Sequence, residues 1–358
     1  MKPAQHIRLR SGRIIGEGHP CFIVAEVGNN HQGDISLARQ MVEGVARAGA
    51  DAVKFQKRDN SALLTADGLK APYTGPNSFG PTYGEHRDAL ELSMEEMAEL
   101  KALSESLGLV FFASAWDMNS LEAMHTLNPE LIKICSADLV NTPYLRRCGE
   151  MGQPIVISTG MSDYEQIDKA VAELRRYHND IVILHCNSSY PCPEDQICLP
   201  VMHDIRARYG LPTGYSGHER GLAPTLAAVA LGAVMVERHF TLDKTMRGTD
   251  HQVSLEPAEL AMLVRMTREI ESSLRGSEKR VFPGEASAAL KLRKSIVAAR
   301  DLPAGSVITA ADLTVKSPGT GLSPDCWDDV IGNTLTRDAR RDEQIKSEML
   351  AVALNGAA

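Results

Sequence analysis

The feature that most constrains the fold of this chain is an alternation of short apolar runs with longer segments of helical periodicity. The apolar runs are rich in β-branched residues and span residues 21–27, 52–56, 109–115, 131–136, 154–159, 181–187, 212–216 and 233–240. Short strands that alternate with helices are typical of βα units and a parallel sheet. Eight such units, completed near residue 280, predict a (β/α)8 TIM barrel.

The pattern changes after the eighth unit. A turn-rich VFPGE segment begins at residue 281, and from residue 293 the chain shows brief β-like pieces broken by PAG, SPGTG and SPD. We therefore predict a barrel over residues 1–282, a linker over residues 283–292 and a small β-rich domain over residues 293–358.

The composition argues against several classes of protein. A net charge of -8 without a local cluster of Lys and Arg argues against nucleic-acid binding. No apolar run approaches the ~18 residues of a membrane span, and the first residues lack the apolar region of a signal peptide. The seven cysteines form no CxxC pair, which predicts reduced, mostly buried thiols and a cytoplasmic location.

Polar side chains recur at the C-terminal ends of the predicted strands, the face where barrel enzymes build their active sites. In strand order they are Glu26; Lys54 and Gln56; Ser114; Lys133 and Ser136; Ser158; His185 and Asn187; Ser216 and His218; Glu237 and His239. A charged side chain among apolar neighbours is costly unless it is paired or binds a ligand. The recurrence therefore predicts a polar pocket, and the long segment 60–84 is predicted to overhang it.

Two lysines suggest an anion site in this pocket. A single basic residue in a strand, such as Arg238, more often pairs with a neighbouring carboxylate. Lys54 and Lys133, however, lie at the same end of the second and fourth strands. Together with Ser136 and Ser158 they are suited to clamp a phosphate or carboxylate.

Two histidines suggest a metal site. His218 and His239 follow the seventh and eighth strands, which are adjacent in a barrel, so their imidazoles can converge on one ion. With Glu26 or Glu237 nearby they would suit a divalent transition metal. For His185, a structural hydrogen bond and metal ligation are equally good interpretations.

Two loop segments have open interpretations. His31, within AEVGNNHQGD, is the weakest candidate there and is equally well a solvated loop residue. The charges of the segment KTMRGTDH, residues 244–251, are typical of a solvated loop, although its position after the eighth strand suits closure over a polar ligand.

A series of motifs, in this order, resembles the sialic acid synthase (N-acetylneuraminate synthase) family. They are AEVGNNHQGD, VKFQ, TYGEH, LIKICSAD, ISTGM, HCNSSYP, GYSGHE and VERHFTLDKTMRGTDHQVSLEP, and the resemblance covers residues 22–349. The segment SIVAARDLPAGSVITAADLTVKSPGTG is similar to the antifreeze-like SAF domain. The resemblance implies a synthase that condenses phosphoenolpyruvate with N-acetylmannosamine, or its 6-phosphate, and releases phosphate.

The resemblance also implies roles for the matching residues. Glu26, Asp138, Tyr190, His218 and His239 would be catalytic; Lys54, Asn77, Lys133, Ser136, Ser158, Ser188 and Ser216 would bind phosphoenolpyruvate; Gln56, Tyr190, Arg247 and Asp250 would contact the sugar. His218 and His239 would hold a divalent metal ion, with Mn2+ as the first choice and Mg2+ or Co2+ as alternatives. The family's domain-swapped arrangement implies a homodimer in which each small domain caps the partner's barrel.

Two positions depart from the bacterial pattern of this family. Asp138 stands where bacterial members have Glu, and Ser317 stands where many have an Arg that binds the sugar's N-acyl group. Animal-type members share both differences and use N-acetylmannosamine 6-phosphate. The resemblance therefore admits a phosphorylated acceptor, for which Arg87, Lys244 or Arg247 would be candidate ligands.

The sequence leaves other functions open. A related synthase would use an acceptor of the legionaminate or pseudaminate type, or the deaminated acceptor that leads to Kdn. A Schiff-base aldolase on the same barrel would use Lys133 as its nucleophile. A binding or ice-structuring module based on the C-terminal segment would leave the polar strand ends unexplained.

Overall fold

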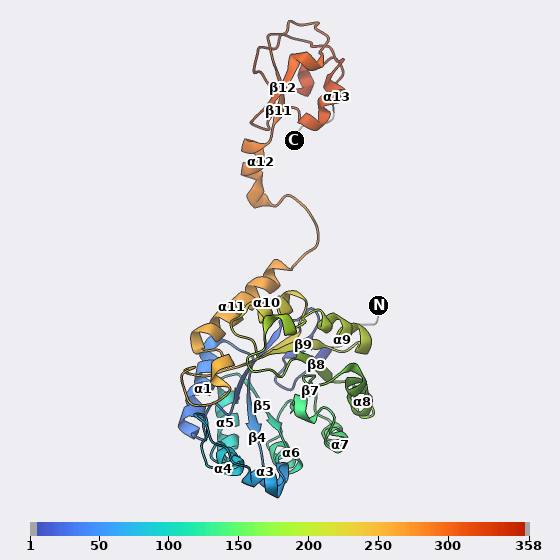
Figure 1. Cartoon of the computed structure of the whole chain (residues 1–358). Helices are drawn as coiled ribbons and strands as arrows, with labels where there is room; N and C mark the ends of the chain where they lie inside the picture. The colour runs from blue at the N-terminus through green and yellow to red at the C-terminus, as the bar shows by residue number, and fades with distance from the viewer. Residues whose placement is uncertain (1–5, 355–358) are drawn as a thin grey trace. The chain divides into compact units, whose positions relative to one another are not determined.

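The computed structural model describes residues 6–354, and its contacts divide the chain into two compact units after Arg275 (Figure 1). Unit 1 contains the predicted barrel, and unit 2 begins at Gly276. Each unit has its own hydrophobic core.

Unit 1 is a closed barrel of parallel strands, which confirms the predicted fold. Within the described residues its eight strands are β3 (Phe22–Gly28), β4 (Ala52–Lys57), β5 (Val110–Ala115), β6 (Ile132–Ile134), β7 (Ile155–Ser158), β8 (Ile181–Cys186), β9 (Thr213–Gly217) and β10 (Met235–His239). Strand β10 pairs with both β9 and β3, and this closes the barrel. Each strand lies within one or two residues of a run predicted from the sequence.

Helices surround the barrel (Figure 1). They are α1 (Ile35–Ala48), α5 (Met94–Ser106), α6 (Met118–Thr126), α7 (Thr142–Glu150), α8 (Tyr164–Leu174), α9 (Val201–Tyr209), α10 (Ala223–Ala230) and α11 (Pro257–Ser273). Their first residues explain where they begin: Asp34 caps α1, and Ser93 and Asp163 open capping boxes on α5 and α8. Helix α1 ends where Gly49 adopts a left-handed conformation, with φ of 82°.

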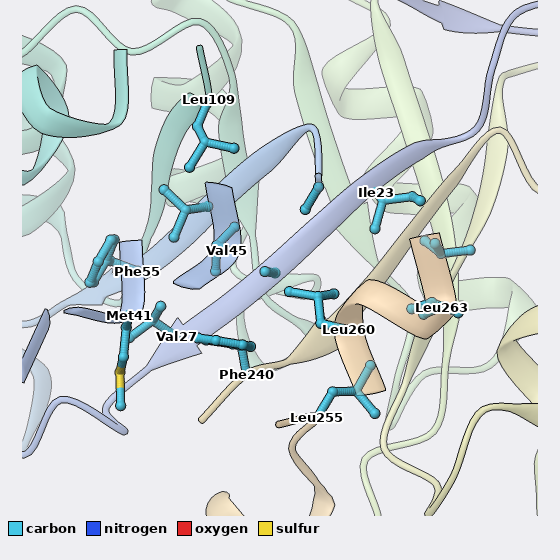
Figure 2. Packing of buried hydrophobic residues seen from close by; sticks show 14 of the residues in the cluster. Ile23, Val27, Met41, Val45, Phe55, Leu109, Phe240, Leu255, Leu260 and Leu263 are labelled. Carbon is cyan, nitrogen blue, oxygen red and sulfur yellow. The ribbon is translucent and has the colours of Figure 1, made fainter. Parts of the chain in front are cut away.

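The main core lies between the outer face of the strands and the helices. Figure 2 shows side chains of this core, among them Ile23 and Val27 of β3, Met41 and Val45 of α1, Phe55 of β4, Phe240 and Leu255, and Leu260 and Leu263 of α11. Residues that alternate with these along each strand point into the barrel instead. Along β3 and β4, the odd-numbered side chains therefore pack against the helices and the even-numbered side chains face the barrel interior.

The barrel interior is apolar toward the N-terminal ends of its strands. Phe22, Val24, Ala52, Phe112, Val156 and Val182 belong to one buried cluster. A hairpin of β1 (His6–Arg8) and β2 (Ile14–Gly16), which the sequence analysis did not predict, adds Ile7 and Ile15 to this cluster. Apolar side chains thus fill the interior up to the polar layer at the C-terminal ends of the strands.

The long segment after β4 is more ordered than its composition suggests. It contains three short helices, α2 (Asn60–Leu63), α3 (Ala66–Lys70) and α4 (Tyr83–Asp88). The side chains of Asp59, Thr65 and Thr82 cap their first turns. Residues 71–82 between α3 and α4 form the longest irregular part of this segment.

Unit 2 is a small domain with short antiparallel strands, as predicted. Helix α12 (Ala286–Leu292) lies within the predicted linker, and β11 (Ser295–Ala298) pairs with β12 (Leu313–Lys316). The core contains Ile296, Leu302, Ile308, Leu335 and Ile345. Backbone hydrogen bonds between turns, such as Leu302 with Ala339, supply much of the remaining order.

Two predictions made from composition can be compared with the structure. All seven cysteines are free thiols, and Cys21, Cys148, Cys186 and Cys192 are buried. Over residues 6–354, no helix has the length and apolar character needed to cross a membrane.

Candidate active site at the C-terminal end of the barrel

Inward-facing polar residues of the barrel strands form one pocket, here called the inner chamber, of about 250 Å³. It is lined by Glu26, Lys54, Gln56, Ser114, Trp116, Lys133, Cys135, Ser136, Ala137, Ser158, Met161, Cys186, Ser188, Tyr190, Ser216, His218, Glu237 and His239. The sheet register explains why these residues meet. Glu26 pairs in register with Lys54 on one side and His239 on the other, and Glu237 pairs with Ser216.

Two lysines and two carboxylates alternate on the wall of the inner chamber. Lys54 forms an ion pair with Glu26 and lies 3.4 Å from Glu237, whose other neighbour is Lys133, also at 3.4 Å. Hydroxyl groups complete the network, because Lys54 donates to Ser114 at 3.1 Å and Lys133 donates to Ser158 at 2.8 Å. Both interpretations of the lysines therefore hold: they are paired, and they face a cavity.

The two carboxylates of this network differ in proton affinity. Burial raises the pKa of Glu26 to about 7, although Lys54 and a hydrogen bond from Gln56 oppose this shift. Burial acts on Glu237 as well, but Lys133 and Lys54 outweigh it and hold the pKa of Glu237 low. Glu26 can therefore exchange a proton near neutral pH, whereas Glu237 stays ionised.

The imidazoles of His218 and His239 are neighbours at the ends of the adjacent strands β9 and β10, with ring centroids 5.5 Å apart. The Nδ1 of His218 lies 2.7 Å from the carbonyl oxygen of Asn187, which only accepts, so Nδ1 carries the hydrogen. Its Nε2 then accepts from the Tyr190 hydroxyl at 2.8 Å. The Nδ1 of His239 is buried and has no hydrogen-bond partner.

Both imidazoles are in the form that can ligate a metal. Burial lowers the pKa of His218 to about 4 and also lowers the pKa of His239, so both rings are neutral at pH 7. Over the described part of the chain, no three His, Cys, Asp or Glu side chains are grouped so as to hold a metal ion. His218 and His239 remain the candidate ligands that line the inner chamber.

A second pocket, here called the outer chamber, adjoins the first at Gln56, Trp116 and Tyr190, which line both. Its volume is about 380 Å³, and it is lined by the loop after α3, by α4 and by residues 247–251. The two loops meet here: Gly248 donates to Asn77 at 3.3 Å, and Arg247 lies 4.5 Å over the ring of Phe79. The predicted overhang of the pocket is thus formed by residues 73–83.

The hydroxyl groups of Ser136 and Ser188 converge on Gly160, and these three residues are here called the Gly160 cradle. The amide of Gly160 donates to the Ser136 hydroxyl at 3.0 Å. A Cβ atom at Gly160 would lie 2.2 Å from the hydroxyl oxygen of Ser188 and 2.8 Å from that of Ser136. Only glycine lets the two hydroxyl groups approach the backbone this closely. The side chains of Ser136 and Ser188 both line the inner chamber, where hydroxyl groups can bind phosphate oxygens.

Comparison with known proteins assigns the chain to a family. It matches the NeuB family over residues 41–279 and the SAF domain over residues 293–351. The chain belongs to the NeuB family.

Named relatives match nearly the whole chain. The N-acetylneuraminate-9-phosphate synthase of Homo sapiens is 39% identical over 346 residues, which are 96% of each chain. The N,N'-diacetyllegionaminic acid synthase of Legionella pneumophila is 37% identical and covers 90% of this chain and 92% of its own. A crystal structure of the N-acetylneuraminic acid synthetase of Leptospira borgpetersenii superposes with a TM-score of 0.70 at 32% identity, covering 80% of this chain and 95% of that one. The protein is thus an enzyme of a synthase family.

Most of the residues that the NeuB resemblance singled out line the two chambers. Glu26, Lys54, Gln56, Lys133, Ser136, Ser158, Ser188, Tyr190, Ser216, His218 and His239 line the inner chamber. Asn77, Arg247 and Asp250 line the outer chamber. Asn77 is therefore grouped with the residues expected to contact the sugar, and not with the lysines and serines expected to bind phosphoenolpyruvate.

Asp138 lines neither chamber. It follows β6 and is buried, where it accepts hydrogen bonds from Asn141 at 3.0 Å and from the Cys135 thiol at 3.2 Å. Burial raises the pKa of Asp138. These contacts place Asp138 behind Cys135, which itself lines the inner chamber.

Four residues whose role the sequence left open are held by contacts within the protein. His31 is buried beside Phe55, so its interpretation as a solvated residue is wrong. The Nε2 of His185 lies 2.6 Å from the carbonyl oxygen of Ile197, which identifies a structural hydrogen bond. Arg238 pairs with Glu219, and Lys244 pairs with Glu259.

Arg58 and Trp116 are site residues that the sequence analysis missed. The Arg58 guanidinium stacks 4.4 Å over the Trp116 ring and donates to the side-chain oxygen of Gln56. That contact turns the Gln56 amide nitrogen toward Glu26, to which it donates at 2.8 Å. The signal available in the sequence was position, since both residues directly follow strands.

Proposed function

We propose that the protein condenses phosphoenolpyruvate with the open-chain form of an N-acylmannosamine-type sugar and releases phosphate. The observation that carries this proposal is that one chamber brings together Lys54, Lys133 and the serines of the Gly160 cradle with the His218 and His239 pair. An enolpyruvate anion and an aldehyde are thereby offered neighbouring sites. The outer chamber has room for the rest of a sugar.

The lysines and the cradle suit phosphoenolpyruvate. Its carboxylate and phosphate are anionic, and Lys133, with Ser136 and Ser188 beside the Gly160 amide, offers a cation and several hydrogen-bond donors. In the proposed reaction carbon 3 of phosphoenolpyruvate forms a bond with the aldehyde carbon. Water then adds at carbon 2, and the tetrahedral intermediate loses phosphate through cleavage of its carbon-oxygen bond.

Glu26 is the residue that we assign to proton transfer. In its protonated form it gives a proton to the aldehyde oxygen, which becomes a hydroxyl group. The resulting carboxylate accepts a proton from the water that adds at carbon 2, so the residue returns to its starting state. A general acid and base works best when its pKa lies near the working pH, and burial brings the pKa of Glu26 to about 7.

His218 and His239 are the residues that would hold a divalent metal ion, with Mn2+ first and Mg2+ or Co2+ as alternatives. The donor set fits: both rings are neutral, Nδ1 of His239 has no partner, and only the Tyr190 hydroxyl contacts Nε2 of His218. When bound there, such an ion supplies Lewis-acid activation of the sugar aldehyde. Removal of metal with EDTA should abolish phosphate release and addition of Mn2+ should restore it. Undiminished turnover after chelation would refute the metal assignment.

The outer chamber favours a phosphorylated acceptor, N-acetylmannosamine 6-phosphate. Within residues 6–354, Arg87 and Arg247 line this chamber without a carboxylate partner: Arg87 donates only to the Tyr83 hydroxyl, at 2.7 and 2.9 Å. Lys244, the third candidate, is paired with Glu259 and lines neither chamber. Two guanidinium groups without a carboxylate partner, next to a space of the size of a sugar, suit a terminal phosphate. The 39% identical human relative is named for a 9-phosphate product, which is consistent with this acceptor.

A panel of acceptors tests this proposal. Release of phosphate from phosphoenolpyruvate would be measured with N-acetylmannosamine, its 6-phosphate and a diacetamido hexose. We expect the 6-phosphate to have the highest kcat/KM, and expect Arg247→Ala to reduce that preference while leaving the KM for phosphoenolpyruvate unchanged. Arg275→Ala, at the opposite end of the barrel, is the control. Equal kcat/KM for the two mannosamines would refute the phosphorylated acceptor.

A diacetamido sugar is the second candidate acceptor, because the legionaminic acid synthase is nearly as similar as the human relative. Preference for that sugar in the same panel would establish it. The Schiff-base alternative predicts that borohydride traps pyruvate on Lys133. We expect no trapping, since Lys133 is engaged with Glu237 and Ser158.

A further inference from the structure

A buried ion pair lies directly behind the two histidines of the inner chamber. Glu219 and Arg238 are 2.8 Å apart, and their side chains are 0% and 1% exposed. Neither residue lines a chamber. Each is the chain neighbour of a histidine, because Glu219 follows His218 and Arg238 precedes His239.

Arg238 ties the turn after β9 to strand β10. It donates to the backbone oxygens of Glu219 at 2.7 Å and Gly221 at 2.8 Å, in addition to the Glu219 carboxylate. Gly217 is the last residue of β9 that is in register with β10, where its partner is Arg238 itself. His218 therefore lies beyond the sheet pairing, and the contacts of Arg238 hold the turn that carries it.

Glu219 is fixed from several sides. Its carboxylate accepts from the Tyr215 hydroxyl at 2.8 Å and from the Thr225 hydroxyl at 2.6 Å. It also folds back over Gly217, where an added Cβ atom would lie 2.3 Å from its oxygen. The Glu219 carboxylate and the two terminal nitrogens of Arg238 thus all have partners, whereas the buried Nε of Arg238 has none.

Stability alone does not explain this pair. Desolvation of two charges largely cancels their attraction, and well-packed apolar residues of similar volume are often as stable. A buried pair held by several hydrogen bonds instead fixes geometry, and residues behind the ligands of a metal commonly orient them.

We propose that Glu219 and Arg238 are positioning residues that set the separation and orientation of the His218 and His239 imidazoles. This inference rests on the proposed function, in which these imidazoles hold a divalent metal ion beside the sugar aldehyde. The pair acts through the backbone on both sides: through residues 218–221 after β9 and through the end of β10.

The test uses Arg238→Lys and the double variant Glu219→Leu/Arg238→Met, which removes both charges and leaves none buried alone. Arg268→Lys is the matched control, because Arg268 forms an ion pair with Asp51, at 3.0 Å, at the N-terminal end of the barrel. Mn2+ affinity of the full-length protein would be measured without substrates by electron paramagnetic resonance of free Mn2+. Steady-state kinetics would give kcat and the KM for phosphoenolpyruvate separately.

We expect both Arg238 variants to bind Mn2+ about 10 to 100 times more weakly than the parent protein. We expect kcat to fall while the KM for phosphoenolpyruvate, which depends on the lysines and the cradle, changes little. The control should match the parent in both. A folded double variant with parental Mn2+ affinity and kcat would overturn the proposal. A parent protein that releases no phosphate from phosphoenolpyruvate would instead refute the proposed function, and that outcome is visible before any variant is made.

Discussion

The pKa of Glu26 depends on two opposing effects: burial favours the protonated form, and two neighbours favour the ionised form. Because Lys54 and Gln56 only partly offset burial, the pKa of Glu26 is raised to about 7. If the protonated acid is required, kcat/KM should fall as pH rises through about 7. Glu26→Gln, which keeps the shape but cannot transfer a proton, should lower kcat by about 10²- to 10⁴-fold. An unchanged pH profile in that variant would exclude Glu26 as the titrating group.

Gln56 provides a finer test of the same assignment. Its hydrogen bond to Glu26 favours the ionised carboxylate and so lowers the pKa of Glu26. Gln56→Leu should therefore raise that pKa and move the alkaline limb of the kcat/KM profile to higher pH. The exposed Gln40 of α1 gives the control, Gln40→Leu, which should leave the profile in place. A shift toward lower pH would contradict the role given to this hydrogen bond.

Adding one methyl group at Gly160 should weaken the binding of phosphoenolpyruvate but not that of the sugar. An added Cβ atom would lie only 2.2 Å from the Ser188 hydroxyl oxygen and 2.8 Å from that of Ser136, so Gly160→Ala must displace both hydroxyl groups that we expect to bind phosphoenolpyruvate. We expect the KM for phosphoenolpyruvate to rise by about tenfold or more, which is about 1.4 kcal/mol of binding free energy. The KM for the sugar should change little. Gly284→Ala, with no atom within 4 Å of the added methyl group, is the control.

At the scale of elements, the hairpin of β1 and β2 fills the end of the barrel opposite the active site. Ile15 is 0% exposed in the cluster that fills the barrel interior. Ile15→Ala should therefore lower the free energy of unfolding of unit 1 by about 2 to 5 kcal/mol. Urea unfolding followed by circular dichroism would measure this, with Leu107→Ala on an exposed helix end as the control. The KM values should stay near those of the parent, since the change is remote from both chambers.

The elements differ in how well the sequence predicts them. The eight barrel strands follow from their apolar runs, and their polar ends predict most of the inner chamber. The hairpin was missed because three-residue strands leave no periodicity to read. The ion pairs depend on register: only the pairing of β3 with β4 places Glu26 beside Lys54. For the same reason, the position of Asn77 in the outer chamber requires the fold of two distant loops.

At the scale of the whole molecule, net charge is a poor guide to the ligand. The chain carries -8, yet the inner chamber presents two lysines to an anionic substrate. Two of the residues that line this chamber, Met161 and Tyr190, are also 69% and 43% exposed. Their side chains would give a partner surface an apolar contact next to the chamber.

We infer that a second copy of the chain supplies this partner surface through its unit 2, in a domain-swapped homodimer. Light scattering should give the mass of a dimer, and a fully active monomer would contradict this inference. Unit 1 has its own core, so a chain that ends at Arg275 should fold but lack activity. The full-length Glu26→Gln variant should retain at most about a hundredth of the parental activity, because its own barrel is impaired.

Mixing these two impaired proteins provides the sharpest test of the swap. In a mixed dimer, the intact barrel of the truncated chain would be covered by unit 2 of the Glu26→Gln chain, and one complete active site would form. We expect phosphate release to rise well above that of either protein alone after the two proteins are mixed and allowed to exchange subunits. As a control, truncation of the Glu26→Gln chain as well removes every unit 2 from the mixture and should leave it inactive. If each unit 2 served only its own barrel, the first mixture would show only the residual activity of the Glu26→Gln chain.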